Sequence, residues 1–156
     1  MRFVKHVLIV LITFAALLTA SPAFAALTRK EARILGAMNR VRAAHGIRPL
    51  RADPTLTRAA RSHSRDMLRR NYFAHGAFAA RMSAFHAPGR ILGENIAWGA
   101  GRLGAAAHVV QMWLESPEHR ANVLQPGFTR VGLSAPEGPF AGSGDVTVVT
   151  ADFSGP

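Results

Sequence analysis

Two imidazoles and one carboxylate have the residue types and settings that could do chemistry. Each lies at the boundary of a predicted element. His75 in NYFAHG and Glu94 in GENIAWG are next to glycine, and His119 in ESPEHRANVL follows shortly after Trp113. Neutral imidazole binds divalent metals, and a carboxylate completes or orients such a site. The same groups could transfer protons, because histidine titrates near neutral pH. The positions are far apart in the sequence, and the H-E-x-x-H pattern of many zinc peptidases does not occur.

Structural roles are the alternative for these side chains. His75 could be a turn residue bonded to the backbone, and Glu94 could satisfy backbone donors. His119 lies in the first turn of a helix predicted to begin after Ser116, where the helix dipole disfavours a cation and lowers the pKa of imidazole. A neutral His119 is free to bind a metal or a proton. His63, in contrast, shares the apolar stripe of its helix, which predicts a structural histidine bonded to a neighbouring loop.

The elements that must position these residues are mostly helical in the first part of the chain. Thr28 and Glu31 form a capping-box pattern that opens a helix ending near Gly46. Asp53 precedes a proline, which predicts a second helix that ends near Asn71. Further helices are predicted at residues 79–85, 103–115 and 117–124.

Residues with β-branched and aromatic side chains mark three candidate strands, at residues 91–99, 128–135 and 145–153. The last two are predicted to be neighbours, joined by a loop rich in glycine and proline at residues 136–144. Helices followed by a small sheet indicate an α+β protein. We therefore predict a three-layer α/β/α sandwich built around a small antiparallel sheet.

The N-terminus has the pattern of a secretory signal peptide. Two basic residues precede an uncharged apolar run at residues 7–20, and an A-x-A cleavage pattern ends at Ala25. The run of 14 residues is shorter than the ~20 residues that span a bilayer, which disfavours the alternative of a retained membrane anchor. We predict a signal peptide at residues 1–25 and one domain at residues 26–156 that is secreted or periplasmic and has no transmembrane segment.

The predicted domain is basic and has no cysteine. It contains 17 lysine and arginine residues against 9 acidic ones, which favours contact with anionic surfaces such as those of the cell envelope. The arginines are scattered along the sequence without a nucleic-acid-binding motif, so nucleic acid is not a predicted partner. Without cysteine the fold has neither disulfides nor a thiolate for catalysis or zinc. One interpretation left open is a surface factor that binds through its arginines alone.

Five stretches carry a resemblance to a known family through their order as well as their content. They are MNRVRAAHGIRPLRADPTLTRAARSHSRDM, NYFAHG, LGENIAWG, MWLESPEHRANVLQPGFTRVGL and VTADFSG. Together they cover about residues 33–154 and resemble the CAP superfamily, which contains the cysteine-rich secretory, antigen 5 and pathogenesis-related 1 proteins. The bacterial SCP-like branch is the most similar.

The resemblance implies an α/β/α sandwich whose cleft holds two histidines and two acidic residues, which in some members bind a divalent cation, often zinc. The matching metal ligands here are His75, Glu94 and His119. In many relatives the second acid lies where this sequence has Ser116, and Glu115 is one residue earlier, a rotation of roughly 100° on a helix. The predicted cleft-lining residues beside the ligands are Asn95, Glu115 and Ser116.

Two departures from the family pattern affect the same region. Glu118 precedes His119, where relatives usually have glycine. Residues 148–153 read VVTADF, where an aromatic residue is commoner. The second departure is expected to reshape the floor of the cleft.

Members of the family are linked to lipid or sterol binding, to host interaction and, in a few cases, to peptidase activity, and a shared fold does not choose among these. The predicted function is an exported binding domain whose His/Glu cleft holds a divalent metal, with zinc as the expected ion, and a small lipid-like or anionic ligand at the cell envelope. The alternative is a metal-assisted hydrolase, a peptidase or esterase, that uses the same cleft. No residue is assigned a catalytic role.

Overall fold

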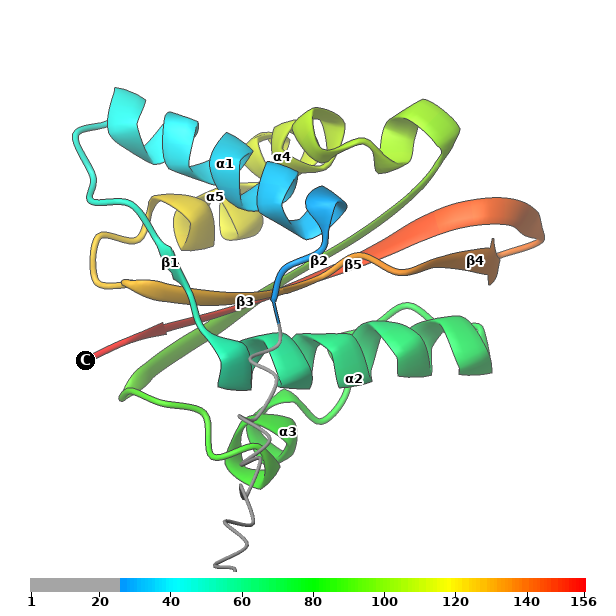
Figure 1. Ribbon diagram of the computed structural model, residues 1–156, viewed down its shortest axis with the longest axis horizontal. Coiled ribbons are helices and arrows are strands. Elements are labelled where there is room, and N and C mark those ends of the chain that lie inside the picture. Colours follow the sequence, from blue (N-terminus) through cyan, green and yellow to red (C-terminus); the bar gives the residue numbers. More distant parts are fainter. Residues whose placement is uncertain (1–25) are drawn as a thin grey trace, which may run out of the picture.

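The computed structural model describes residues 26–156, and the predicted signal peptide, residues 1–25, lies outside the described residues. Its helices are α1 (Arg29–Ala44), α2 (Pro54–Arg70), α3 (Phe78–Ala84), α4 (Ala106–Glu115) and α5 (Pro117–Leu124), with a short 3₁₀ helix at Gly101–Gly104. Figure 1 shows α1, α4 and α5 on one face of the sheet and α2 with α3 on the other. No helix in the described part of the chain is long and apolar enough to cross a membrane.

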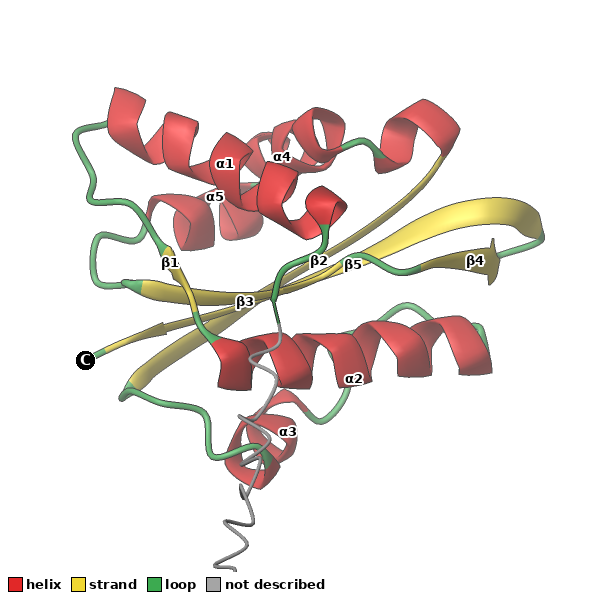
Figure 2. Ribbon diagram, in the orientation of Figure 1, coloured by secondary structure: helices red, strands yellow, loops and turns green. Residues whose placement is uncertain are grey.

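The strands form one sheet in which the last strand lies in the middle (Figure 2). They are β1 (Arg51–Ala52), β2 (Ile91–Ala100), β3 (Arg130–Ser134), β4 (Glu137–Phe140) and β5 (Ser143–Gly155). The order is β1-β3-β5-β2, and β4 also pairs with β5. β2, β3 and β4 run antiparallel to β5, whereas β1 pairs in parallel with β3. The predicted α/β/α sandwich is confirmed, and the sheet has one parallel pair that the sequence did not predict.

Capping residues set the starts of the first two helices. The Thr28 hydroxyl accepts a hydrogen bond from the N–H of Glu31, whose carboxylate accepts one from the N–H of Thr28, so the predicted capping box is confirmed. Asp53 accepts two backbone N–H groups at the start of α2, and Asn71 ends that helix in the left-handed conformation. Ser116 occupies the predicted cap position before α5, although its side chain makes no capping hydrogen bond.

Alternation of side chains along the strands divides the interior into two parts. Val149 packs in the core under α1 and α4, whereas Val148 packs with Met67 of α2 on the other face. The same alternation applies to β2, since successive side chains of a strand point to opposite faces. The neighbours Glu94 and Asn95 therefore serve different layers of the sandwich.

Two short strands lie in segments that the sequence predicts to be loops. β4 occupies part of residues 136–144 and pairs with β5 around a register shift between Gly138 and Phe140. β1 is only two residues long and lies in the connection between α1 and α2. Neither strand is long enough to show the apolar alternation that marks a strand in a sequence, and glycine and proline interrupt β4.

Helix α2 packs directly on the backbone of β3 at Gly132. A Cβ atom built on Gly132 would lie 2.0 Å from the carbonyl carbon of Leu56 and 2.2 Å from the backbone nitrogen of Thr57. Both of these atoms belong to the main chain of α2, so rotation of a side chain could not relieve the contact. The distance between the helix and the sheet therefore depends on glycine at this position.

One buried arginine ties α1 to the segment around α5. Arg42 is fully buried, and its guanidinium donates hydrogen bonds of 2.8–3.0 Å to the carbonyl oxygens of Arg48, Val123, Gln125 and Phe128. Burial lowers the pKa of Arg42 from its ordinary value, and its partners are dipoles rather than carboxylates. The side chain thus holds the loop after α1 and the end of α5 against α1.

Candidate functional site

The two histidines and Glu94 come together at the edge of the sheet. His75 lies in the loop after α2, Glu94 on the edge strand β2 and His119 in the first turn of α5. α2 and α5 cover opposite faces of the sheet (Figure 1), so the loop after α2 and the first turn of α5 both lie next to the edge strand β2. The ring centroids of His75 and His119 are 6.5 Å apart. The structure therefore brings all three predicted residues into one region.

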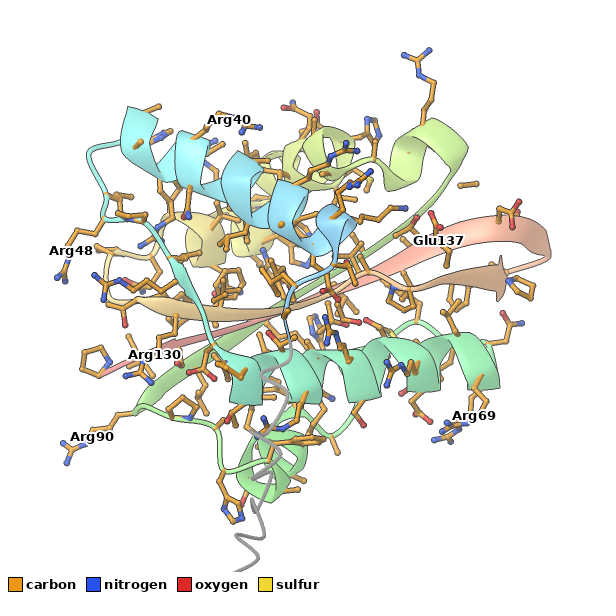
Figure 3. All side chains as sticks on the ribbon, in the orientation of Figure 1. Arg40, Arg48, Arg69, Arg90, Arg130 and Glu137 are labelled. Atoms are coloured by element: carbon orange, nitrogen blue, oxygen red, sulfur yellow. The ribbon has the colours of Figure 1, made fainter. Side chains whose placement is uncertain are left out.

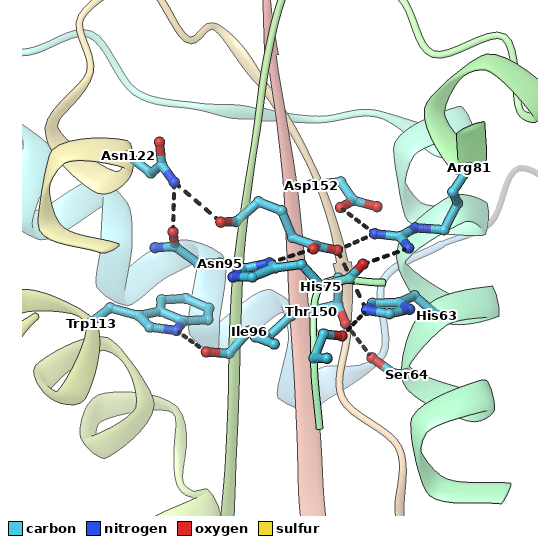
Figure 4. A network of polar contacts seen from close by, with 12 residues as sticks. His63, Ser64, His75, Arg81, Asn95, Ile96, Trp113, Asn122, Thr150 and Asp152 are labelled. Atoms are coloured by element: carbon cyan, nitrogen blue, oxygen red, sulfur yellow. Dashed lines mark hydrogen bonds and ion pairs between the residues drawn. The ribbon is translucent and has the colours of Figure 1, made fainter. Parts of the chain in front are cut away.

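Glu94 is buried, and each of its carboxylate oxygens has a partner. Oε1 lies 2.7 Å from Nδ1 of His75, and Oε2 accepts a hydrogen bond from the guanidinium of Arg81. Figure 4 shows Arg81, His75 and His63 directed at the same region. An ionised carboxylate only accepts hydrogen bonds, so Nδ1 of a neutral His75 carries the hydrogen and Nε2 keeps its lone pair. Glu94 thus orients His75 as carboxylates commonly orient metal-binding histidines.

His63 reaches the same network from α2. Its Nε2 lies 3.0 Å from the carbonyl oxygen of Ala74 and 3.8 Å from Oε2 of Glu94. The bond to Ala74 confirms the predicted structural histidine that contacts a neighbouring loop, and the position next to Glu94 was not predicted. Desolvation, followed by the charge of Arg81, lowers the pKa of His63 below its ordinary value. A neutral His63 is therefore expected beside the Glu94–Arg81 pair.

Arg81 and Asp152 are site residues that the sequence-based prediction missed. Asp152 on β5 is the register partner of Glu94 on β2 and is completely buried. Its Oδ1 lies 4.0 Å from the guanidinium of Arg81, and within residues 26–156 neither carboxyl oxygen has a hydrogen-bond partner. Burial raises the pKa of Asp152 well above its ordinary value, and the charge of Glu94 raises it further. Asp152 is thus a buried acid, beside Glu94, that holds its proton more tightly than an ordinary aspartic acid does.

Replacement of this buried acid by its neutral amide is expected to stabilise the protein as the pH rises. A raised pKa means that the folded state binds the proton of Asp152 more tightly than the unfolded state does. The stability of the wild type therefore falls as pH rises through the folded pKa, and Asp152→Asn removes this loss. We expect the variant to unfold with a free energy about 1 kcal/mol or more higher than wild type above neutral pH.

Urea unfolding at several pH values measures this effect. Asp145→Asn is the matched control, because Asp145 lies on the same strand and is exposed. It should leave the difference between acidic and alkaline stability unchanged. A stability difference between Asp152→Asn and wild type that does not grow with pH, or an Asp152→Asn variant less stable than wild type at every pH, contradicts the raised pKa of Asp152.

Two amides hold α5 against the other face of β2. Nδ2 of the buried Asn95 donates to the carbonyl oxygen of His119 at 2.9 Å. Nδ2 of Asn122 donates to the carbonyl oxygen of Glu94 at 3.1 Å and to Oδ1 of Asn95 at 2.9 Å. Asn122 therefore bridges the backbone of Glu94 and the side chain of Asn95. These contacts fix the position of His119 relative to the strand that carries Glu94.

The remaining predicted cleft-lining residues lie in different settings. Ser116 is half-buried at the start of α5. Glu115 is exposed at the end of α4, where its carboxylate accepts a hydrogen bond of 2.9 Å from the side-chain amide of Gln111. Glu118, in the first turn of α5, is also exposed. Ser116 is thus the half-buried residue among these three.

Neutral imidazole is favoured at His119 as well. Desolvation by burial lowers the pKa of His119, and the neighbouring His75 lowers it further. The direction agrees with the prediction, although these causes are burial and a second ring rather than the helix N-terminus named from the sequence. His75 and His119 could then offer two nitrogen donors to one divalent cation.

Whether the site fits a metal ion depends on which partners occupy the two carboxylate oxygens of Glu94. In the described residues 26–156, no three histidine, cysteine, aspartate or glutamate side chains are arranged to hold a metal ion. Both oxygens of Glu94 are engaged, by His75 and by Arg81. The donors present therefore fit a site of two imidazoles with a carboxylate behind one ring, rather than three protein ligands.

Comparison with known sequences identifies a family. The model of the cysteine-rich secretory protein family, CAP, matches residues 35–153, which include every residue of the site. The Bacillus subtilis protein YkwD is 34% identical over 120 residues, which are 74% of this chain and 46% of YkwD. The B. subtilis membrane protein YlbC is 35% identical over 111 residues, 68% of this chain and 31% of YlbC. The chain thus spans less than half the length of these curated relatives.

Solved structures have the same fold. An extracellular protein containing an SCP domain from Bacillus anthracis has a TM-score of 0.67 and 28% sequence identity, over 81% of this chain and 40% of that one. An outer surface protein from Borrelia burgdorferi has a TM-score of 0.65 over 84% of this chain and 97% of that one. At 19% identity, the second likeness concerns the fold alone.

Proposed function

The chain belongs to the cysteine-rich secretory protein family, CAP, and from this premise we propose that it is an exported binding domain that holds a divalent cation between His75 and His119. Zinc is the expected ion, because it takes imidazole nitrogen readily and tolerates a site with open positions. One similar protein is extracellular and another is an outer surface protein, which supports action at the cell envelope.

The contact between His75 and Glu94 carries this proposal. The distance of 2.7 Å between Nδ1 and the carboxylate fixes the ring and its tautomer, and the ring of His119 lies 6.5 Å away, centroid to centroid. The side chain of Asn95 lies on the opposite face of β2 from that of Glu94. It holds His119 in place by donating a hydrogen bond to the carbonyl oxygen of His119. A cation held there would supply positive charge for a small anionic or lipid-like ligand, with the half-buried Ser116, three residues before His119, as a predicted polar neighbour.

Titration of the purified domain with zinc, or with cobalt(II) as a spectroscopic probe, tests the site. We expect one bound equivalent at neutral pH in the wild type and none in His75→Ala or His119→Ala. Glu94→Gln keeps an acceptor for His75 but removes the negative charge behind the ring, so we expect about 10- to 100-fold weaker binding. His108→Ala, on α4, is the matched control and should bind as the wild type does.

The pH dependence of the same titration has a defined sign. Protons compete with a cation for the ring nitrogens, so affinity should fall as pH drops through the histidine range. The lowered pKa of His119 places its own protonation below the pH at which an ordinary histidine protonates. Unchanged binding in both alanine variants, or equal loss in His108→Ala, would rule out this pair as the ligands.

The same samples distinguish cation binding from hydrolysis, the alternative function that the sequence leaves open. A metal-assisted hydrolase would turn over a peptide or ester substrate in the wild type and would lose that activity in Glu94→Gln without unfolding. A binding domain would show the metal titration without turnover. The whole-protein activities of the longer relatives do not decide this, since the chain matches less than half of each.

A further inference from the structure

A groove that does not include the imidazoles of His75 and His119 lies between α2 and α3. Its volume is about 1010 Å³. The arginines that are scattered in the sequence are gathered here along one wall by the helix: Arg58, Arg61, Arg65, Arg69 and Arg70. Arg81 and His63 lie at its inner end, so the groove runs up to the site without including His75, Glu94 or His119.

Helix geometry produces this wall. Arg58, Arg65 and Arg69 are separated by seven and four residues, spacings that return to the same face of an α-helix. All three are exposed, and Figure 3 shows Arg69 projecting from the end of α2. The face of α2 that does not pack on the sheet is therefore a continuous row of guanidinium groups about 16 Å long, at 1.5 Å per residue.

The groove keeps a net positive charge even after the ion pairs of its lining residues are subtracted. Within residues 26–156, neither Arg58 nor Arg65 takes part in an ion pair. Asp66 is the acidic lining residue, and it is shared by Arg69 at 2.5 Å and Arg70 at 3.3 Å. Guanidinium groups left without a carboxylate are suited to bidentate contact with phosphate oxygens.

The opposite wall is apolar. It is formed by α3 and the residues that flank it, through Ala77, Ala80, Ala84 and Phe85. Ala80 and Ala84 are exposed, so no other part of the described chain covers this wall. A row of cations that faces a row of small apolar side chains matches an amphiphile with an anionic head better than it matches a fully hydrated polyanion.

The chain enters the domain beside this groove. The guanidinium of Arg61 donates a hydrogen bond of 2.8 Å to the carbonyl oxygen of Ala26, the first described residue. The start of the described chain is therefore held against the arginine wall of the groove.

We propose that the α2/α3 groove docks the domain on a membrane of anionic phospholipid, with the phosphate headgroups on Arg58, Arg65 and Arg69. The alanines of α3 then lie against the upper part of the acyl chains. This inference concerns a different surface from the proposed cation site and does not rest on it. The same docking leaves the face with α1, α4 and α5 toward the solvent.

Co-sedimentation with vesicles tests the proposal on residues 26–156. The vesicles are phosphatidylcholine with phosphatidylglycerol, compared with phosphatidylcholine alone. The triple variant R58Q/R65Q/R69Q should bind the anionic vesicles roughly 100-fold more weakly, since each arginine near an anionic bilayer contributes about a factor of five. R33Q/R40Q/R120Q is the matched control, because it removes three exposed arginines from α1 and α5 on the opposite face.

Equal loss in both triple variants would overturn the proposal, because it would mean that total charge alone attracts the domain. A second variant acts on the other wall: Ala80→Glu places a carboxylate at an exposed helix position opposite the arginines and should weaken vesicle binding at unchanged melting temperature. Groove-dependent binding of inorganic polyphosphate without binding to vesicles would also overturn it. Zinc titration should be unaffected by the groove variants, which separates this result from the fate of the cation site.

Discussion

Gly132→Ala should strongly destabilise the protein, because the backbone of α2 packs directly on this residue of β3. The added Cβ would lie 2.0–2.3 Å from three main-chain atoms of α2, in Leu56 and Thr57. Relief requires α2 to move away from β3, which would loosen the apolar layer around Met67. We expect a loss of about 3 kcal/mol or more in the free energy of unfolding. Urea unfolding followed by circular dichroism measures this loss.

A glycine on β5 provides the control for this prediction. Nothing lies within 4 Å of a Cβ built on Gly144, and this residue is exposed. Gly144→Ala should therefore change the stability by no more than about 0.5 kcal/mol. If Gly132→Ala unfolds at the same urea concentration as Gly144→Ala, the direct backbone contact between α2 and β3 is wrong.

Arg42→Ala is expected to cost about 4 kcal/mol of stability, or roughly 15 °C in melting temperature. The substitution leaves the carbonyl oxygens that Arg42 satisfies without their donor, and two of these bonds are fully buried, to Val123 and Phe128. It also leaves a cavity in place of a fully buried side chain. Thermal and urea unfolding of the variant measure the loss.

Two further substitutions on the same helix define this effect. Arg40→Ala removes an exposed arginine and should lie within about 0.5 kcal/mol of the wild type. Arg42→Lys keeps the charge but cannot reproduce the fork of donors, so it should recover only part of the loss. Equal stability of Arg42→Ala and Arg40→Ala would refute a structural role for the buried guanidinium.

Much of the fold follows from local patterns. The capping box at Thr28, the Asp53–Pro54 helix start and the long apolar strands are encoded within a few residues, and the structure confirms each of them. β1 and β4 could not be predicted, because each is defined by the strand with which it pairs rather than by its own composition. The parallel pairing of β1 with β3 has no local signature at all.

The residues of the candidate site also divide into those that a local sequence pattern marks and those that only the fold reveals. His75 and Glu94 stand out as polar residues next to glycine, and His119 stands out in the first turn of a predicted helix. The structure places all three together. Arg81 gives no such signal, because it is one of many arginines and its role depends on the angle at which α3 approaches β2. Asp152 did carry a signal, as an acid in an otherwise apolar strand, and the register with Glu94 explains its importance.

The arginines of α2 show a further limit of prediction from the sequence alone. Along the sequence, Arg58, Arg65 and Arg69 are separated by other residues and resemble the general excess of arginine. Their common face depends only on helical periodicity and could have been recognised. The apolar wall opposite them comes from α3, and only the folded chain shows that the two segments border one groove.

The position of β5 has a consequence for when this protein can acquire its structure. β2, β3 and β4 all take their hydrogen-bond partners from residues 143–155, which follow all three of them in the sequence. Until those residues have been synthesised, these three strands lack the central strand to which each is hydrogen-bonded. Closure of the sheet around β5 therefore comes after synthesis of the other strands, and deletion of residues 143–155 would leave β2, β3 and β4 without their common partner.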